Sequence, residues 1–127
     1  MKKAILLIAF GLLVAMMLAA CGGDEAADEE PAVSKGDAVA GEKHFQVCAG
    51  CHGPDAKGLP NLGKDMTISV FIKGSTDEEL VDFIKTGRPI SDPENTTNVD
   101  MPPKGGNPAF SDEDLFDVVA YLRTLTE

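Results

Sequence analysis

Two cysteines and a histidine form the feature that most constrains how this chain can fold. Residues 48–52 read Cys-Ala-Gly-Cys-His. Cys48 and Cys51 lie about one helical turn apart, so both thiols can reach the two vinyl groups on one edge of a single porphyrin. The adjacent His52 then falls under the iron and can ligate it through a ring nitrogen. The motif therefore predicts one covalently attached haem of the c type.

The same cysteine spacing also occurs in zinc sites and in thiol redox sites. A zinc ion needs about four ligands, and the candidates near the motif, Cys48, Cys51, His52 and His44, are crowded into nine residues with no second C-x-x-C. A thioredoxin-like motif would follow a strand in a βαβ pattern, which this sequence lacks. Haem is the favoured interpretation, and both alternatives stay open on the residues alone.

The first twenty residues are typical of an export signal. Two lysines near the start precede an apolar run over residues 4–18, and Leu-Ala-Ala-Cys ends it at Cys21. This ending resembles the lipobox of bacterial lipoproteins, which implies that residues 1–20 are removed and that Cys21 carries lipid. The alternative is an uncleaved membrane helix, although residues 4–20 are at the short limit for spanning a bilayer. In both cases the globular part lies outside the cytoplasmic membrane and is held at its surface.

Charge and composition restrict the partners of the chain. The formal net charge is −10, and it is more negative without Lys2 and Lys3 of the export signal. No basic stripe is present, so nucleic acid is not expected as a partner, whereas a basic protein surface is. Residues 22–36 contain five acids and no aromatic residue, which predicts that residues 21–36 form a flexible acidic tether.

Residues 37–127 are expected to form an all-α haem domain. Apolar residues recur at helical spacing in three stretches, and no convincing strand is visible. A capping residue stands at the start of each stretch: Asp37, Thr76 and Ser111, with Glu79 completing a capping box with Thr76. The expected helices cover residues 37–49, 77–86 and 112–124, and a shorter helical turn is expected around residues 67–72.

The long irregular stretch over residues 87–110 holds a candidate second iron ligand, Met101. A thioether is a soft ligand that favours an electron-transfer iron of raised potential. The following Pro102 and Pro103 make the backbone extended and stiff, which suits a ligand that has to stay in place. Met66, His44 and an open sixth position are the alternatives.

These motifs together resemble the small single-haem class I cytochromes c of bacteria, over residues 37–127. The resemblance rests on Gly41, Phe45, the motif at 48–52, Gly-Leu-Pro-Asn-Leu at 58–62, Met-Pro at 101–102 and Val-Val-Ala-Tyr-Leu at 118–122. It implies a small all-α fold in which the first and last helices cross. Gly41 and Phe45 would pack there against Tyr121 and Leu122. It also implies that the carbonyl of Pro60 accepts a hydrogen bond from the ring of His52; a simple turn is the alternative for Pro60.

Two features depart from that family pattern. Phe45 precedes Cys48 by three residues where many members have four, so an adjusted end of the first helix is expected. The loop over residues 90–100 is long and polar. It could cover the haem edge, dock a partner, or do neither, and the sequence leaves all three open. Within it Asn95-Thr96-Thr97 matches a glycosylation acceptor but is interpreted as plain loop.

The function expected from the resemblance is transfer of one electron at a time, with His52 and Met101 as iron ligands, Cys48 and Cys51 as attachment points, and no enzymatic activity of the chain alone. The expected partners are redox proteins: a quinol-oxidising complex, a terminal oxidase, or a small copper or haem carrier. A complex subunit, as in alternative complex III, is a narrower form of the same interpretation. Lys57 and Lys104 are docking candidates, with plain surface lysines as the alternative. A haem sensor or peroxidase-like enzyme with an open iron site is the competing function.

Overall fold

The computed structural model describes residues 35–126, so the predicted signal peptide (1–20), Cys21 and nearly all of the acidic tether lie outside the described residues. Within them the chain is all-α, with no strand and two isolated β-bridges. None of the described helices is both long and apolar enough to cross a bilayer. The elements are α2 (Ala38–Phe45), α3 (Ala49–His52), α4 (Val70–Gly74), α5 (Asp77–Thr86), the 3₁₀ helix η1 (Pro103–Gly106) and α6 (Asp112–Leu125).

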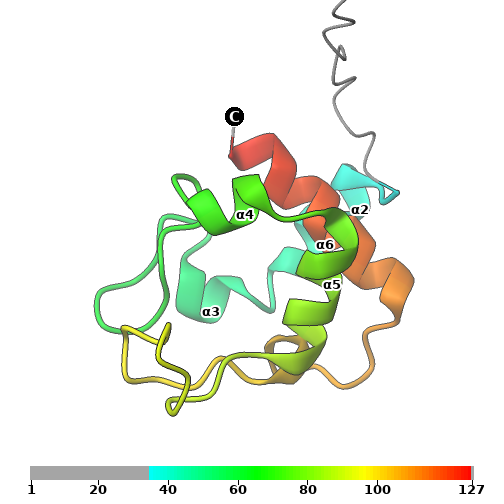
Figure 1. Cartoon of the computed structure of the whole chain (residues 1–127). Coiled ribbons are helices and arrows are strands. Elements are labelled where there is room, and N and C mark those ends of the chain that lie inside the picture. The colour runs from blue at the N-terminus through cyan, green and yellow to red at the C-terminus, as the bar shows by residue number, and fades with distance from the viewer. Residues whose placement is uncertain (1–34, 127) are drawn as a thin grey trace, which may run out of the picture. The chain divides into compact units, whose positions relative to one another are not determined.

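Helices α2 and α6 cross and pack against each other, as the resemblance implied (Figure 1). Gly41 lies at the crossing, where a Cβ atom would stand 1.9 Å from the carbonyl oxygen of Asp117 and 2.9 Å from the Cβ of Tyr121. Phe45 is fully buried beside it, with its ring centroid 5.3 Å from that of Tyr121. The absence of a side chain at Gly41 therefore lets the two backbones meet.

The first helix is shorter than the sequence predicted. It ends at Phe45 instead of reaching residue 49. The next three amides bond to carbonyls three residues back, and the last of them joins Cys48 N to Phe45 O at 2.8 Å. This tighter turn separates α2 from α3, so the haem-binding motif begins its own short helix.

Helices α5 and α6 have the boundaries and caps that the sequence predicted, with α6 one residue longer. Thr76 and Glu79 form a complete capping box on α5, and Ser111 forms one with Asp114 on α6. Hydrogen bonds from the backbone and hydroxyl of Ser111 hold the pKa of the Asp114 carboxyl below its ordinary value. The predicted turn over residues 67–72 is displaced, because Ser69 caps a helix that begins at Val70.

The hydrophobic core lies between α2, α5 and α6. The fully buried side chains include Phe45, Leu115, Val118 and Val119. Further side chains from α4 and α5, among them Ile72, Leu80, Val81 and Ile84, join the same cluster. Helix α3 and much of the loop after α5 lie to the left of α5 and α6 in Figure 1.

Arg123 fastens α6 to the turn between α4 and α5. Its guanidinium donates to Asp77 Oδ1 at 3.0 and 2.9 Å, to the carbonyl of Ser75 at 2.5 Å, and to the carbonyl of Ile72. The Asp77 side chain is only 11% exposed. A planar guanidinium with several donors can satisfy all these acceptors at once, so one side chain fixes three elements together.

Candidate haem site

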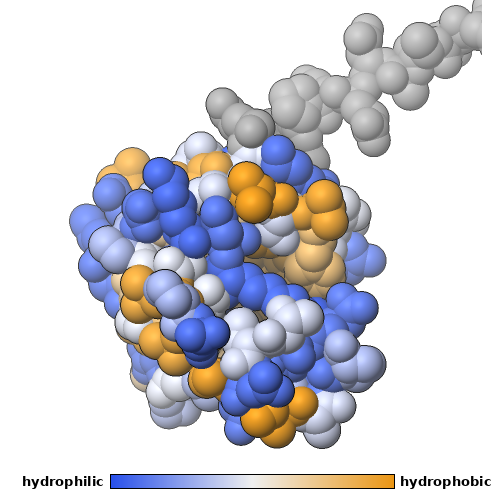
Figure 2. All heavy atoms as spheres, turned by 90° about the vertical axis from the view of Figure 1, so that its left-hand side faces the viewer, coloured by the Kyte–Doolittle hydropathy of each residue, from blue (hydrophilic) through white to orange (hydrophobic). Residues whose placement is uncertain are grey.

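A cavity of about 430 Å³ brings together the four residues that the sequence assigned to the haem and its iron: Cys48, Cys51, His52 and Met101. It is bounded by α3, α4, the segment between them, Phe83 of α5 and the loop that follows α5. No residue of α2 or α6 lines it. The face of the molecule that carries these loops shows apolar surface interrupting a largely polar one (Figure 2).

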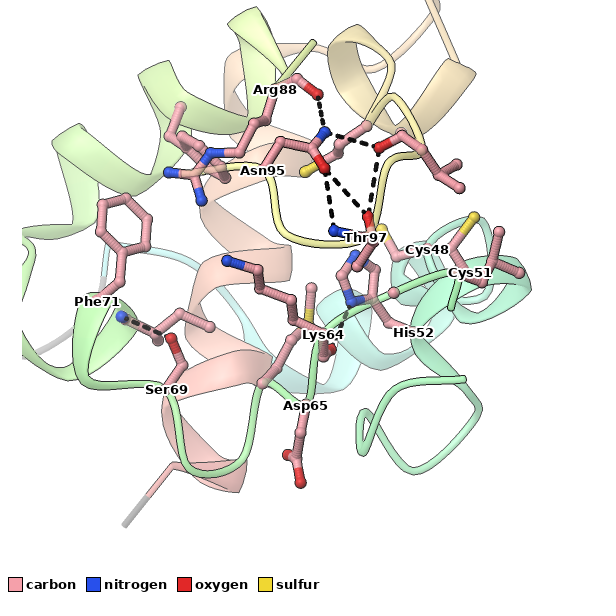
Figure 3. A pocket seen from close by; sticks show the side chains of 18 of the residues that line it. Cys48, Cys51, His52, Lys64, Asp65, Ser69, Phe71, Arg88, Asn95 and Thr97 are labelled. Atoms are coloured by element: carbon pink, nitrogen blue, oxygen red, sulfur yellow. Dashed lines mark hydrogen bonds between the residues drawn. The ribbon is translucent and has the colours of Figure 1, made fainter. Parts of the chain in front are cut away.

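The cysteines occupy one turn of helix, as their spacing predicted. Cys48 precedes α3, and its carbonyl accepts hydrogen bonds from the amides of Cys51 and His52 at 3.1 and 3.0 Å. Burial, reinforced by the neighbouring Cys51, raises the pKa of the Cys48 thiol to about 11. Both sulfurs line the cavity together with His52 (Figure 3), so two thioether bonds can form at one edge of a bound ring.

The ring of His52 is oriented by Lys64. Its Nδ1 lies 2.9 Å from the carbonyl oxygen of Lys64 (Figure 3). A histidine that donates through Nδ1 presents Nε2 as the nitrogen available to a metal. The interaction thus selects which nitrogen faces the cavity.

Pro60 does not have the role that the resemblance implied. It is exposed and does not line the cavity, and the carbonyl beside His52 belongs to Lys64. The reason is a tight turn in which Leu59 bridges Gly63, with the Leu62 and Gly63 amides both bonding to the Leu59 carbonyl. The turn carries Pro60 outward at its tip and returns the chain to the histidine four residues later.

Met101 lines the cavity from a different segment of the chain. It forms an isolated antiparallel bridge with Arg88, in which each amide donates to the other residue's carbonyl at 2.9 Å. The bridge follows Gly87, whose φ is +72° and where a Cβ atom would lie 2.3 Å from the Met101 carbonyl oxygen. Gly87 therefore both ends α5 and lets the methionine segment approach closely.

The competing ligands differ in placement. Met66 also lines the cavity, but it follows Lys64 by two residues and so belongs to the segment that contacts His52 Nδ1. His44 faces α6, where its Nε2 lies 3.3 Å from Asp114 Oδ1. It does not line the cavity, and within residues 35–126 no cluster of three or more His, Cys, Asp or Glu residues is arranged to hold a metal ion.

Two cationic side chains stand at the cavity, Lys64 and Arg88. The Arg88 guanidinium lies over the rings of Phe83 and Phe71, 4.8 and 5.6 Å from their centroids. Its buried Nε lies 3.3 Å from Asp92 Oδ2, yet without the alignment of a hydrogen bond. A buried donor without an aligned acceptor suits a cavity that takes an anionic group.

The loop after Arg88 is more ordered by hydrogen bonds than its sequence indicated. The side chain of Asn95, interpreted from the sequence as plain loop, bonds to both limbs of this loop. Lys64 Nζ donates to the carbonyl of Glu94 at 2.8 Å, so one residue contacts His52 through its carbonyl and the opposite loop through its ammonium. The signal that could have found Asn95 is an asparagine among prolines in a turn-rich segment, because its side chain readily bonds to nearby backbone.

The two docking candidates among the lysines have structural partners. Lys104 Nζ donates to the carbonyl of Phe110 at 2.6 Å and so holds η1 to the start of α6. Lys57 forms an exposed ion pair with Asp55 at 3.9 Å. Neither residue lines the cavity.

Comparison with known proteins gives the family. The family model for cytochrome c matches residues 38–126, which is most of the chain. The chain belongs to the cytochrome c family. Cytochrome c-551 of Bacillus subtilis is 35% identical over 95 residues, covering 69% of this chain and 79% of that protein. Cytochrome c-554(548) of Halomonas halodenitrificans is 34% identical over 94 residues, covering 68% of this chain and 93% of that protein.

A cytochrome c oxidase subunit is also among the relatives. The cbb3-type subunit FixP of a Bradyrhizobium strain is 41% identical over 54 residues, which cover 41% of this chain and 19% of FixP. No solved structure matches the chain significantly. The fold is the small all-α cytochrome c fold, and the cofactor of this cytochrome c is haem c, covalently attached. Its size and its single Cys48–Cys51 pair accommodate one haem.

The cavity has the features that haem c requires. Both cysteines line the cavity, His52 and Met101 line it from separate segments, and Lys64 and Arg88 are cationic lining residues that would be able to neutralise the anionic propionates of a bound haem. The wall between them is largely apolar, with Leu62, Ile68, Val70, Phe71 and Ile72 among its members. A large apolar ring can therefore be enclosed with its polar groups satisfied.

Proposed function

We propose that this cytochrome c is a membrane-anchored one-electron carrier whose iron is held by His52 and Met101. The observation that carries the proposal is that a single cavity is lined by both cysteines, the histidine and the methionine. When bound, haem c supplies a metal centre that accepts and releases one electron. Cys48 and Cys51 would fix the ring, and the Lys64 carbonyl engages Nδ1 of His52, which would leave Nε2 as the nitrogen available to the metal.

Met101 is the better candidate for the second ligand because of where it is fixed. Both the amide and the carbonyl of Met101 are hydrogen-bonded to the backbone of Arg88, so the backbone that carries the thioether has a defined position. Met66 is on the segment whose Lys64 carbonyl contacts His52 Nδ1, whereas Met101 is held on a separate segment by its bridge to Arg88. A pair of ligands held from two rigid segments keeps its geometry when the iron changes charge, which suits rapid electron exchange.

The membrane anchor and the location are further parts of the proposal. The apolar start of the chain and Leu-Ala-Ala-Cys support lipidation at Cys21 and a position outside the cytoplasmic membrane. The partners are redox proteins: a quinol-oxidising complex, a terminal oxidase, or a small copper or haem carrier. The relatives named as cbb3 oxidase subunits favour a terminal oxidase or membership of such a complex. Mass spectrometry of the membrane-extracted protein is expected to find a chain that begins at a lipid-modified Cys21, and an unmodified chain that keeps residues 1–20 would contradict lipid anchoring.

The deciding experiment is an optical redox titration of the haem-loaded protein, with and without carbon monoxide. One reversible one-electron wave, unchanged by carbon monoxide, is expected from a closed His52–Met101 iron. In Met101→Ala the potential should fall strongly and carbon monoxide should bind, whereas Met66→Leu should keep the sulfur ligand. A wild-type spectrum that shifts under carbon monoxide, or a Met101→Ala variant identical to wild type, would favour a sensor or peroxidase-like function instead.

A further inference from the structure

We propose that Asn95 is the positioning residue for Met101, because its side chain ties together the two backbone limbs on which the methionine rests. This inference rests on the proposed ligation of the iron by Met101. In this proposal Asn95 is not an iron ligand. It acts on Met101 through the backbone of residues 88–101. Figure 3 shows Asn95 between Arg88 and Thr97, above His52 and Lys64.

The amide nitrogen of Asn95 joins the entering limb of the loop to the leaving limb. Nδ2 donates to the carbonyls of Val99 at 2.8 Å, Pro89 at 3.2 Å and Arg88 at 3.4 Å. The Arg88 carbonyl also accepts from the Met101 amide, and Val99 precedes Met101 by two residues. Asn95 thus contacts the backbone on both sides of the bridge that holds the ligand.

The amide oxygen organises the turn between those limbs. Oδ1 accepts from the backbone amides of Asn98 at 3.1 Å and Thr97 at 3.2 Å, and from the Thr97 hydroxyl at 3.3 Å. Asn98 has a left-handed backbone, with φ of 57°, which reverses the chain toward Val99. The side-chain orientation is determined by its partners, because donors surround one end of the amide and carbonyls surround the other.

The loop depends on these bonds because it has no regular secondary structure of its own. Residues 87–102 contain no helix, and their one ladder contact is the Arg88–Met101 bridge. Asp100 adds a bond to the amide of Ile90, and Lys64 adds its bond to Glu94 from across the cavity. When the Asn95 bonds are lost, a loop without regular secondary structure opens locally at a lower free-energy cost, and opening here would withdraw the methionine from the iron.

Replacing the amide by a carboxylate tests the donor half of the contact. Asn95→Asp keeps the size of the side chain but sets an anionic oxygen against three carbonyl oxygens. We expect a weakened sulfur-to-iron absorption band in the ferric protein and a roughly tenfold rise in the rate of carbon monoxide binding to the ferrous protein. The helical circular dichroism of the haem-loaded protein should be retained. Asn95→Ser, which adds no charge, should change both readouts in the same direction.

Asn107→Asp is the matched control. It adds the same charge a few residues beyond Met101, and it keeps the Oδ1 acceptor that bonds to the Ala109 amide at 3.1 Å. We expect the band and the carbon monoxide rate of this variant to equal those of the wild type. An equal change in Asn107→Asp would assign the effect to charge and overturn the positioning role.

The remaining outcomes separate the two proposals. Unchanged band and carbon monoxide rate in both Asn95 variants, or changes that occur only together with loss of helical signal, would overturn the role of Asn95. If Met101→Ala also left both readouts unchanged, the ligation by Met101 itself would be wrong. If Met101→Ala abolished the band while the Asn95 variants kept it, only the inference about Asn95 would fail.

Discussion

Single residues decide how closely the segments of this cytochrome c approach one another. Gly41 is the clearest case, because backbone atoms of α6 occupy the space where its side chain would be. Gly87 has the same role where the methionine segment passes α5. At both positions the missing side chain matters more than the helix propensity of glycine.

Gly41→Ala should therefore destabilise the haem-loaded protein. An added Cβ would lie 1.9 Å from a backbone carbonyl oxygen, so α2 and α6 would have to separate. We expect the free energy of unfolding to fall by about 3 kcal/mol in chemical denaturation. Gly74→Ala is the control, since a Cβ there meets no atom within 4 Å and the variant should be unchanged within about 0.5 kcal/mol. Equal stability of the two variants would refute the close fit at Gly41.

The residues that carry the motif could be predicted, while their supporting contacts could not. The cysteine spacing and the position of Gly41 are local patterns with one strong structural interpretation. Which carbonyl orients His52 depends instead on how a short turn closes. Because Leu59 bridges Gly63, the carbonyl that lies beside His52 Nδ1 is that of Lys64 and not that of Pro60. Asn95 was missed because its partners are backbone groups brought together only when the loop folds.

Among the elements, α6 is the one to which most of the others are attached. Its first turn is closed by a capping box, its middle crosses α2, and its last turn carries Arg123. The helices with strong caps, α5 and α6, were predicted almost to the residue. The end of α2 and the start of α4 were not, because tertiary packing and a cap at Ser69 set them.

Arg123→Met should separate the end of α6 from the α4–α5 turn. The variant keeps an apolar stem but leaves Asp77, which is largely buried, without its guanidinium partner. The expected loss in the free energy of unfolding is about 2 kcal/mol, reduced from a fully buried case because the arginine is 28% exposed. Lys85→Met, which breaks an exposed pair with Asp112 at 2.9 Å, should cost less than about 1 kcal/mol. Denaturant midpoints of the two variants would contradict this ranking if they coincided.

The cap of α6 should make stability depend on pH in the acid range. Hydrogen bonds from Ser111 lower the pKa of Asp114 in the folded protein, so the folded state favours the ionised carboxylate. That contribution is present above the ordinary pKa of the group and is lost as the pH falls through the lowered value. The difference in melting temperature between wild type and Asp114→Asn should therefore be present at neutral pH and shrink on acidification. A difference that stays constant down to strongly acidic pH would show that this carboxylate is not linked to folding.

For the whole molecule, the acidic charge sets the behaviour expected toward partners. With a net charge of −10 before haem attachment, the protein should attract a basic redox partner over long range. The rate of electron exchange with a basic redox protein should fall roughly tenfold as salt rises from about 0.01 M to about 0.5 M, because the screening length shrinks. The rate with a small anionic reagent should rise over the same range. Stopped-flow kinetics would contradict the expectation if both rates changed in the same direction.

The fold class could be predicted from the sequence, but the cavity is a property of the folded molecule. Its lining comes from segments far apart in the chain, such as Lys64 and Glu94, which are joined across it by a hydrogen bond. No periodicity or motif in the sequence indicates that these two residues are in contact. The same holds for the placing of Arg88 over two phenylalanine rings.

The place where the preceding chain joins the domain affects how the protein can be attached to other objects. Lys35 pairs with Glu78, its Nζ lies 5.6 Å from the ring centroid of Phe116, and the amide of Asp37 donates to Asp117 at 2.7 Å. None of these residues lines the cavity. A fusion protein, an affinity tag or an electrode linker placed ahead of Lys35 is therefore joined to the domain at residues that do not line the cavity, which makes this end of the domain the point of choice for immobilising the protein.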